Sequence, residues 1–316
     1  SSIIGSTAGQ QAMAQASYFG ALNNTNVTLN NNGIISLSGN NSLGMFTDYG
    51  TINNNNIINV TGNGSVAIYG ENGTNAQNFG SITIGSKGVG IYAISDQDLL
   101  TSSGFGDNGV IVKNSGTITS NGGSGATGIY ADNNAGVVSP ATLDLDNGTI
   151  NLGTSDKAVG IYANQMNITG GGTVTVGSNG VGMYASNSNV MLSNLTMNLN
   201  GNNAVGYYID GNNSSFSGTG TVNISGQNIV LFNINSTSPT IDFSGITLGT
   251  EAPGSSYILG NLTNAKIIYN SAANLKSNGI LFNGLNTNIV LGSSSNVTAA
   301  PGSTGVAAIV SDGQYA

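Results

Sequence analysis

The chain of 316 residues contains no cysteine, histidine, tryptophan or arginine, and only 6% of its residues are charged. Without histidine and cysteine, the Ser-His-Asp and Cys-His arrangements of nucleophilic catalysis cannot be built. Five lysines stand against thirteen carboxylates, for a net charge of −8. An acidic chain of this kind does not neutralise the phosphates of nucleic acids, so we expect no nucleic-acid partner.

Long hydrophobic runs are also missing. No apolar stretch approaches the ~20 residues that a membrane-spanning helix needs, so we expect no direct membrane insertion by this segment. The first residues, Ser1 to Ile4, include neither an initiator methionine nor a basic stretch. This start predicts a mature or excised piece of a longer protein.

What the chain has in abundance is glycine, with 49 residues, and asparagine, which is as frequent. Such a polar composition is also typical of disordered segments, but those lack the regularly spaced Val, Ile, Leu and Tyr found here. The bias therefore indicates many tight turns between short strands.

A hexapeptide of the pattern small-Val-Gly-Ile-Tyr-Ala recurs through the middle of the chain. Its six close copies occupy residues 65–70, 88–93, 126–131, 158–163, 180–185 and 204–209, with degenerate copies at 43–46, 229–232 and 279–282. Phe46, Tyr69 and Tyr92 follow one another at steps of 23 residues. An alternating strand such as Ile82-Thr83-Ile84 precedes each copy, and a weaker third strand follows it.

Three short strands per repeat, joined by Gly/Asn turns, predict an all-β fold: a right-handed parallel β-helix of about eleven rungs of about 22 to 24 residues, rising ~4.8 Å each. We place this solenoid at residues 26–316 and expect it to continue beyond them. Residues 1–25 are predicted to be a cap segment, because the Ala/Gln/Met-rich stretch from Thr7 to Leu22 suits a short helix.

The alternation of side chains along a strand assigns faces to the hexapeptide. In residues 89–93, Val89, Ile91 and Ala93 share one face, and Gly90 and Tyr92 share the other. Because the preceding strand offers only aliphatic residues for a core, we assign Val, Ile and Ala to the interior. Gly and Tyr are then expected outside.

The resulting aromatic row is the first candidate surface. It comprises Phe46, Tyr69, Tyr92, Tyr130, Tyr162, Tyr184, Tyr208 and Phe232. Two interpretations stay open: a stacking ladder that stabilises the sheet, which we favour, or an aromatic strip for sugar rings or a partner protein.

Two repeats are longer than the others, and their extra residues are the second candidate surface. Tyr92 and Tyr130 are 38 residues apart, and Tyr130 and Tyr162 are 32 apart. Both insertions follow the Tyr motif, at residues 94–108 and 132–146. We therefore expect them to protrude side by side at one corner, where solenoid insertions often bind ligands. Their acidic and apolar residues are Asp96, Asp98, Leu99, Leu100, Phe105, Asp107, Asp132, Asp144 and Asp146.

These insertions have two equally weighted interpretations, a binding site for a cationic or protein ligand and a pair of solvated loop tips. No spacing matches a Ca²⁺-binding motif, so we predict no metal site and no cofactor. Asp144 and Asp146 alternate with Leu143 and Leu145, and are expected outside as polar neighbours of core residues.

We do not expect the lyase or hydrolase activity that some parallel β-helix proteins have. Lyase chemistry uses an Arg or Lys base beside Ca²⁺-binding aspartates, and hydrolase chemistry uses clustered Asp with a supporting His. The chain has no Arg and no His, and only five lysines. We therefore predict that the protein is not an enzyme, and keep a polysaccharide-degrading enzyme as the least favoured alternative.

The iterated Val-Gly-Ile-Tyr-Ala motif, preceded by Gly-Thr-Ile-Thr-type strands, resembles the passenger domain of bacterial type V autotransporters, and among them the large fusobacterial outer-membrane adhesins. The resemblance covers roughly residues 26–316. It implies display on the bacterial surface by a C-terminal barrel and adhesion to host cells or other bacteria through protein or glycan receptors. No binding residue carries over, because the shared motif is scaffold. The alternative is a purely structural stalk of a larger surface protein; in either case we expect a monomer.

Overall fold

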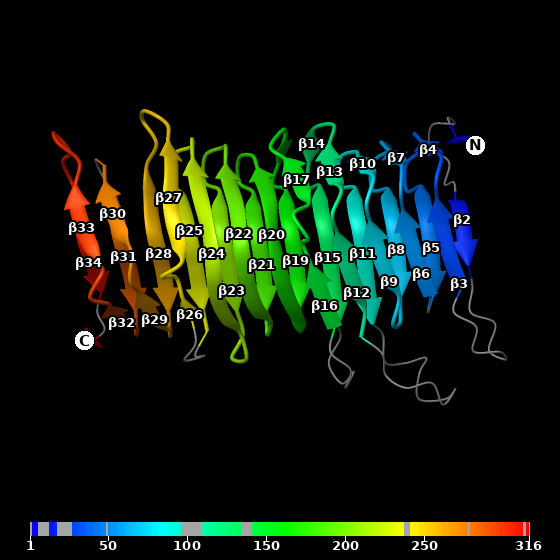
Figure 1. Ribbon diagram of the computed structural model, residues 1–316. Helices are drawn as coiled ribbons and strands as arrows, with labels where there is room; N and C mark the ends of the chain where they lie inside the picture. Colours follow the sequence, from blue (N-terminus) through cyan, green and yellow to red (C-terminus); the bar gives the residue numbers. More distant parts are fainter. Residues whose placement is uncertain are drawn as a thin grey trace.

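The computed structural model describes residues 2–5, 13–17, 27–48, 50–95, 109–133, 141–236, 241–276, 279–311 and 314–315. Throughout these ranges the chain forms parallel strands stacked along one long axis (Figure 1). The predicted right-handed parallel β-helix is confirmed. No helix in these ranges is long and apolar enough to cross a membrane.

One sheet contains the Tyr motifs, and we call it the tyrosine sheet. Its twelve described strands, one per rung, run in chain order along the axis. They are β2 (Met13–Ser17), β5 (Leu43–Asp48), β8 (Val66–Glu71), β11 (Val89–Ser95), β15 (Thr127–Asn133), β19 (Val159–Asn164), β21 (Val181–Ser186), β23 (Val205–Asp210), β25 (Ile229–Asn235), β28 (Tyr257–Thr263), β31 (Ile280–Leu285) and β34 (Ala307–Ser311).

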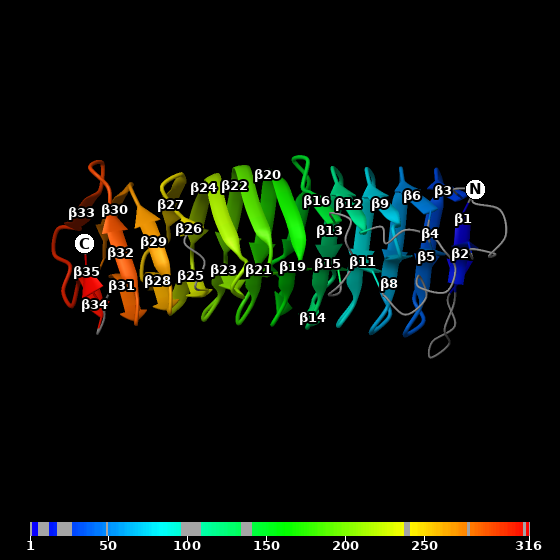
Figure 2. The ribbon, with the colours of Figure 1, turned by 90° about the horizontal axis from the view of Figure 1, so that it is seen from below.

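The rest of each rung belongs to a second, longer sheet with two sides (Figure 2). The side that follows the tyrosine sheet contains β3 (Val27–Asn31), β6 (Gly50–Asn54), β9 (Asn75–Asn78), β12 (Ile111–Asn114), β16 (Ala141–Asp144), β26 (Ile241–Asp242), β29 (Lys266–Tyr269), β32 (Asn288–Leu291) and β35 (Gln314–Tyr315). The side that precedes it contains β1 (Ser2–Gly5), β4 (Ile34–Leu37), β7 (Ile57–Val60), β10 (Ser81–Ile84), β13 (Thr117–Ser120), β17 (Thr149–Leu152) and β27 (Ile246–Glu251).

The predicted three strands per rung hold for the first rungs and change in the middle. In the middle rungs, one continuous strand runs through both sides of the long sheet. These strands are β20 (Met166–Val176), β22 (Asn189–Leu199) and β24 (Ser215–Ile224). The register shifts between Gly170 and Gly172, where the continuous strand bends. A positive φ at both glycines permits this bulge.

Two short pairs complete the described strands. β14 (Gly123–Ser124) pairs with β18 (Ser155–Asp156), and β30 (Ala272–Leu275) pairs with β33 (Asn296–Ala299). Each pair is a two-stranded sheet separate from the long sheet.

The prediction of an N-terminal helix is wrong for the residues that the structure describes. Ser2–Gly5 pairs with β4, and Met13–Ser17 pairs with β5. Both segments add a rung to the stack. Ala and Gln are good helix formers, but intrinsic propensity is a small effect that pairing with the open edges of β4 and β5 overrides. The other residues of the predicted helix, 7–12 and 18–22, lie outside the described ranges.

The predicted faces of the hexapeptide are right for Ile91, Tyr92 and Ala93 and wrong for Val89 and Gly90. Ile91 and Ala93 are buried and Tyr92 is half-buried at the surface. Gly90 points inward, because a Cβ atom there would lie 2.7 Å from Cγ2 of Ile118 on the opposite wall. Val89 therefore lies outside. The alternation fails at Gly90, which the ladder skips: Val89 and Ile91 are paired with the next rung.

A column of asparagines is buried between β3 and β12. The Nδ2 of Asn31 donates to Oδ1 of Asn54, Asn54 donates to Asn78, and Asn78 donates to Asn114, each at 2.8 Å. All four side chains are buried. The column ends at Asn114, because the residue above it on the next rung is the buried Leu145.

Candidate functional site: the tyrosine face and the insertion corner

The outer surface of the tyrosine sheet holds the predicted aromatic row. Ladder pairing places each ring directly over the next, from Phe46 over Tyr69 through to Tyr184 over Tyr208. The two long repeats do not interrupt it, because Tyr130 pairs with both Tyr92 and Tyr162. All seven rings are half-buried.

The rings change packing geometry along the row. Tyr69 meets Phe46 and Tyr92 edge to face, with interplanar angles of 68° and 89°. From Tyr92 to Tyr208 the rings are stacked, with centroids 4.5 to 5.2 Å apart and interplanar angles of 7° to 20°. A stacked ring inside the row has a neighbour on each face, so it offers its edge and hydroxyl to solvent. This packing favours the stacking-ladder interpretation over stacking on sugars.

Phe232 does not belong to this row, contrary to expectation. It pairs with Tyr207 and is buried in the core, where it stacks on Tyr207 and Phe243. The partner of Tyr208 is Asn233, which begins a column of asparagines in the same position. Val205 and its partner Val230 are 25 residues apart, whereas Tyr208 and Phe232 are 24 apart. The alignment of Tyr208 with Phe232 was therefore one residue out of register.

Carboxylates flank the tyrosines, and sequence reasoning missed three of them. The residue two places after the aromatic position is Asp48, Glu71, Asp132 or Asp210 on four of the rungs. Tyr69 donates to Glu71, Tyr130 donates to Asp132 over 3.4 Å, and Tyr184 donates to Asp210 over 3.1 Å. The fixed offset from the tyrosine was the signal that could have revealed this column.

Burial and these carboxylates hold the phenols in their neutral form. Partial burial and Asp210 raise the pKa of Tyr184 to about 12. Burial, followed by the charge of Asp132, raises the pKa of Tyr92, Tyr130 and Tyr162. Asp132 thus acts on three successive rings.

The two insertions leave and rejoin the solenoid at one corner. Ser95, the last residue of β11, pairs with Asn133, the last residue of β15. On the far side, Ile111 at the start of β12 pairs with Thr142 of β16. The predicted common corner is therefore confirmed for the ends of both insertions. The predicted residues Asp96, Asp98, Leu99, Leu100, Phe105 and Asp107 lie outside the described residues.

The assignment of Asp132, Asp144 and Asp146 to the protruding insertions is wrong. Asp132 lies in β15, Asp144 ends β16 and Asp146 follows it, so all three belong to the solenoid beside this corner. The outward positions expected for Asp144 and Asp146 are confirmed. Leu143 and Leu145 are buried, and the aspartates between and after them face outward. Asp146 forms an ion pair of 3.0 Å with Lys113 and accepts a hydrogen bond from Ser115. These two bonds lower the pKa of Asp146. Asp132 is bound by Asn164 from the next rung, 2.9 Å away, and stays on the tyrosine face.

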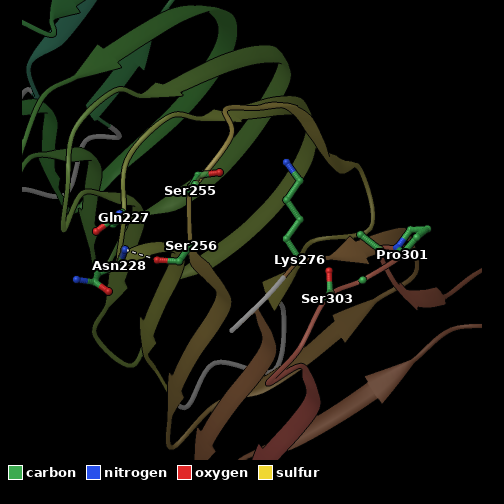
Figure 3. Close-up of a pocket in the computed structure, with 10 residues that line it drawn as sticks. Gln227, Asn228, Ser255, Ser256, Lys276, Pro301 and Ser303 are labelled. Carbon is green, nitrogen blue, oxygen red and sulfur yellow. Dashed lines mark hydrogen bonds between the residues drawn. The ribbon is translucent and has the colours of Figure 1, made fainter.

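A hollow of about 730 Å³ lies at another corner, near the C-terminal end of the described chain. The corner between β30 and β31 is shorter than the corners between β27 and β28 and between β33 and β34. Lys276 stands in the resulting gap, between Ser255 and Ser256 on one side and Pro301 and Ser303 on the other (Figure 3).

The charge of Lys276 is already partnered. Its Nζ lies 3.1 Å from Oε2 of Glu251 and donates to the Glu251 carbonyl oxygen over 3.3 Å. The other described residues of the lining are serines, Gln227 and Asn228, together with glycines, Ala300 and Pro301, and none of them is aromatic. Sequence reasoning missed this hollow, because it arises from differences in corner length rather than from a motif.

Within the described ranges, no three His, Cys, Asp or Glu residues gather in a group that could hold a metal ion. The described residues form a solenoid with three surface features: the tyrosine face, the corner where both insertions leave and rejoin the solenoid, and the hollow around Lys276. The chain matches no family model, no curated protein and no solved structure.

Proposed function

We propose that this chain is the passenger segment of a bacterial surface adhesin, whose solenoid presents the two insertions to a receptor protein or glycan on host cells or other bacteria. The observation that carries the proposal is the undisturbed register beside the insertions. Fifteen residues separate β11 from β12 and seven separate β15 from β16, against three between β8 and β9. The rungs on both sides nevertheless pair residue for residue.

The solenoid accommodates both insertions without any change in the pairing of its strands, so the inserted residues do not serve the assembly of the solenoid. The core column continues through both long rungs, from Ala93 to Ala131 to Ala163. Both insertions leave and rejoin the solenoid at the same corner of adjacent rungs, which is the usual position of binding loops on a repeat scaffold.

Adhesion of the purified chain to host cells and to other bacteria tests this proposal. The test variant shortens both insertions to the turn Asn72-Gly73-Thr74, which connects β8 to β9. Residues 96–109 and residues 134–140 are each replaced by one glycine, and Ser95→Asn supplies the first turn residue. Ser95 and Val110 occupy the rung positions of Asn72 and Thr74, so the ladder can close.

A matched pair of charge variants separates a specific site from general electrostatics. Asp96→Asn, Asp98→Asn and Asp107→Asn remove three charges from the first insertion, and Asp48→Asn, Glu71→Gln and Asp210→Asn remove three from the tyrosine face. We expect the shortened variant and the first triple variant to lose adhesion while the second retains it. Adhesion that is unchanged in the shortened variant would overturn the assignment to the insertions.

A structural stalk is the second candidate, and the covered ring faces of the tyrosine row favour it. A stalk binds neither cells nor a glycan and receptor panel, with its insertions intact or shortened. Specific binding by the intact chain would exclude it.

A further inference from the structure

The tyrosine row brings oxidisable phenols unusually close together. From Tyr92 to Tyr208, five tyrosines stand on successive rungs with centroids no more than 5.2 Å apart. The shortest separation, 4.5 Å, is between Tyr130 and Tyr162. Each ring is half-buried, so one edge is open to a small oxidant. Pairing through the backbone keeps the neighbours in place.

A proton acceptor is also built into the row. The hydroxyls of Tyr130 and Tyr184 donate to carboxylates, of Asp132 and Asp210 respectively. A phenol that loses an electron becomes a very strong acid, and a hydrogen-bonded carboxylate takes its proton without any rearrangement. The row therefore offers neighbouring rings and an acceptor for the released proton in one fixed arrangement.

We propose that the tyrosine row is a site of oxidative cross-linking, in which tyrosines on adjacent rungs couple to dityrosine and fasten the rungs covalently. Each of two phenols loses one electron and one proton, the proton passing to the adjacent carboxylate or to water. The two phenoxyl radicals join through a carbon–carbon bond between ring carbons ortho to the oxygens. Each ortho hydrogen then returns to its oxygen, restoring both aromatic phenols.

The net change is the loss of two electrons and two protons. The co-reactant is hydrogen peroxide acting through a peroxidase, which takes up both and forms two molecules of water. This chemistry needs no cysteine, which the chain lacks, and supplies a cross-link that disulfides supply in other exported proteins. It is independent of whether the insertions bind a receptor.

Two triple variants of the full chain test the proposal at equal tyrosine content. In the alternating variant, Tyr92→Phe, Tyr162→Phe and Tyr208→Phe leave every remaining tyrosine of the row between two phenylalanines. In the block variant, Tyr162→Phe, Tyr184→Phe and Tyr208→Phe leave Tyr69, Tyr92 and Tyr130 adjacent. Phenylalanine keeps the stacking in both, and circular dichroism checks that both retain the β-helix.

Each protein is treated with horseradish peroxidase and hydrogen peroxide, and dityrosine is measured by its fluorescence and by mass spectrometry of cross-linked peptides. We expect intrachain cross-links between row neighbours in the wild type and block variant, and at least a fivefold loss of intrachain dityrosine in the alternating variant. Asp132→Asn should slow coupling between Tyr130 and its neighbours. Equal intrachain dityrosine in the two triple variants, or cross-links only between chains, would overturn the proposal.

Discussion

The buried asparagine column makes a graded prediction, because its members have unequal hydrogen bonding. Asn54 accepts from Asn31 and donates to Asn78, both at 2.8 Å. Asn114 accepts from Asn78, but its own Nδ2 is buried without a partner in the described part of the chain. The same substitution to leucine should therefore cost very different amounts at the two positions.

Asn54→Leu removes both bonds of the column and a longer one of 3.4 Å from the backbone N–H of Asn56, and it leaves Oδ1 of Asn78 buried without a donor. A lost bond costs about 1 kcal/mol and an orphaned buried polar atom about 1–3 kcal/mol, so we expect a destabilisation of about 2–4 kcal/mol. Asn114→Leu removes the bond that Nδ2 of Asn78 donates to Asn114, but this nitrogen keeps the carbonyl oxygen of Thr117 as an acceptor at 3.5 Å. The substitution also eliminates the Nδ2 of Asn114, which was already without a partner, and places leucine over Leu145. We expect about 1 kcal/mol or less.

Urea denaturation and amide hydrogen exchange measure this difference. A solenoid can lose rungs separately, so exchange should be read for β6, β7 and β9 around Asn54 and for β12 and β16 around Asn114. Asn54→Leu should accelerate exchange in its own rungs by roughly 30-fold or more. Equal effects at the two positions would refute the reasoning that the ladder, rather than burial alone, stabilises these rungs.

Two further predictions concern the tyrosine sheet. Gly160→Ala places a Cβ atom 2.4 Å from the carbonyl oxygen of Gly182, so it should lower the free energy of unfolding in urea by about 1–3 kcal/mol. Val159 points outward, so Val159→Ala should lower it by less than about 1 kcal/mol. The opposite order would restore the face assignment made from the sequence. Because the pKa of Tyr184 is raised to about 12, its contribution to stability is complete below pH ~10 and is lost as pH rises through 12. In a pH titration followed by absorbance, Tyr184 should ionise at a higher pH than a free phenol, and Asp210→Asn should lower the pH at which it ionises. A titration curve that Asp210→Asn leaves unchanged would contradict the role of Asp210.

The period of the repeat predicted the solenoid, since regular spacing of Val, Ile and Tyr directly reflects rung length. Faces were harder to predict. Alternation holds only in a regular strand, and Gly90 lies at an irregularity where two successive residues point inward. The signal available was the size of the residue. From Gly44 to Gly206 this position holds only Gly or Ala, which a close approach to the opposite wall requires, and from Leu231 to Leu281 it holds a buried leucine.

The misplacement of Phe232 has a similar origin. Aromatic residues occur both on the outer row and in the core, so matching Tyr208 to the next aromatic residue chose the wrong column. Aligning Val205 with Val230 gives the pairing that the structure has. The residues of the insertions carry no repeat at all, which is why the sequence predicts where they begin and end and nothing of how they are arranged.

The strand pairing also determines how the molecule would respond to a pulling force. Hydrogen bonds between rungs run along the long axis, with the first and last strands at opposite ends of the rod (Figure 1). Tension between these ends loads the rungs in series, so they should detach one at a time. A rung of 23 residues, such as that from Phe46 to Tyr69, would release about 80 Å of chain. A covalent bond between adjacent tyrosines would join two such units and remove one step from the sequence of ruptures.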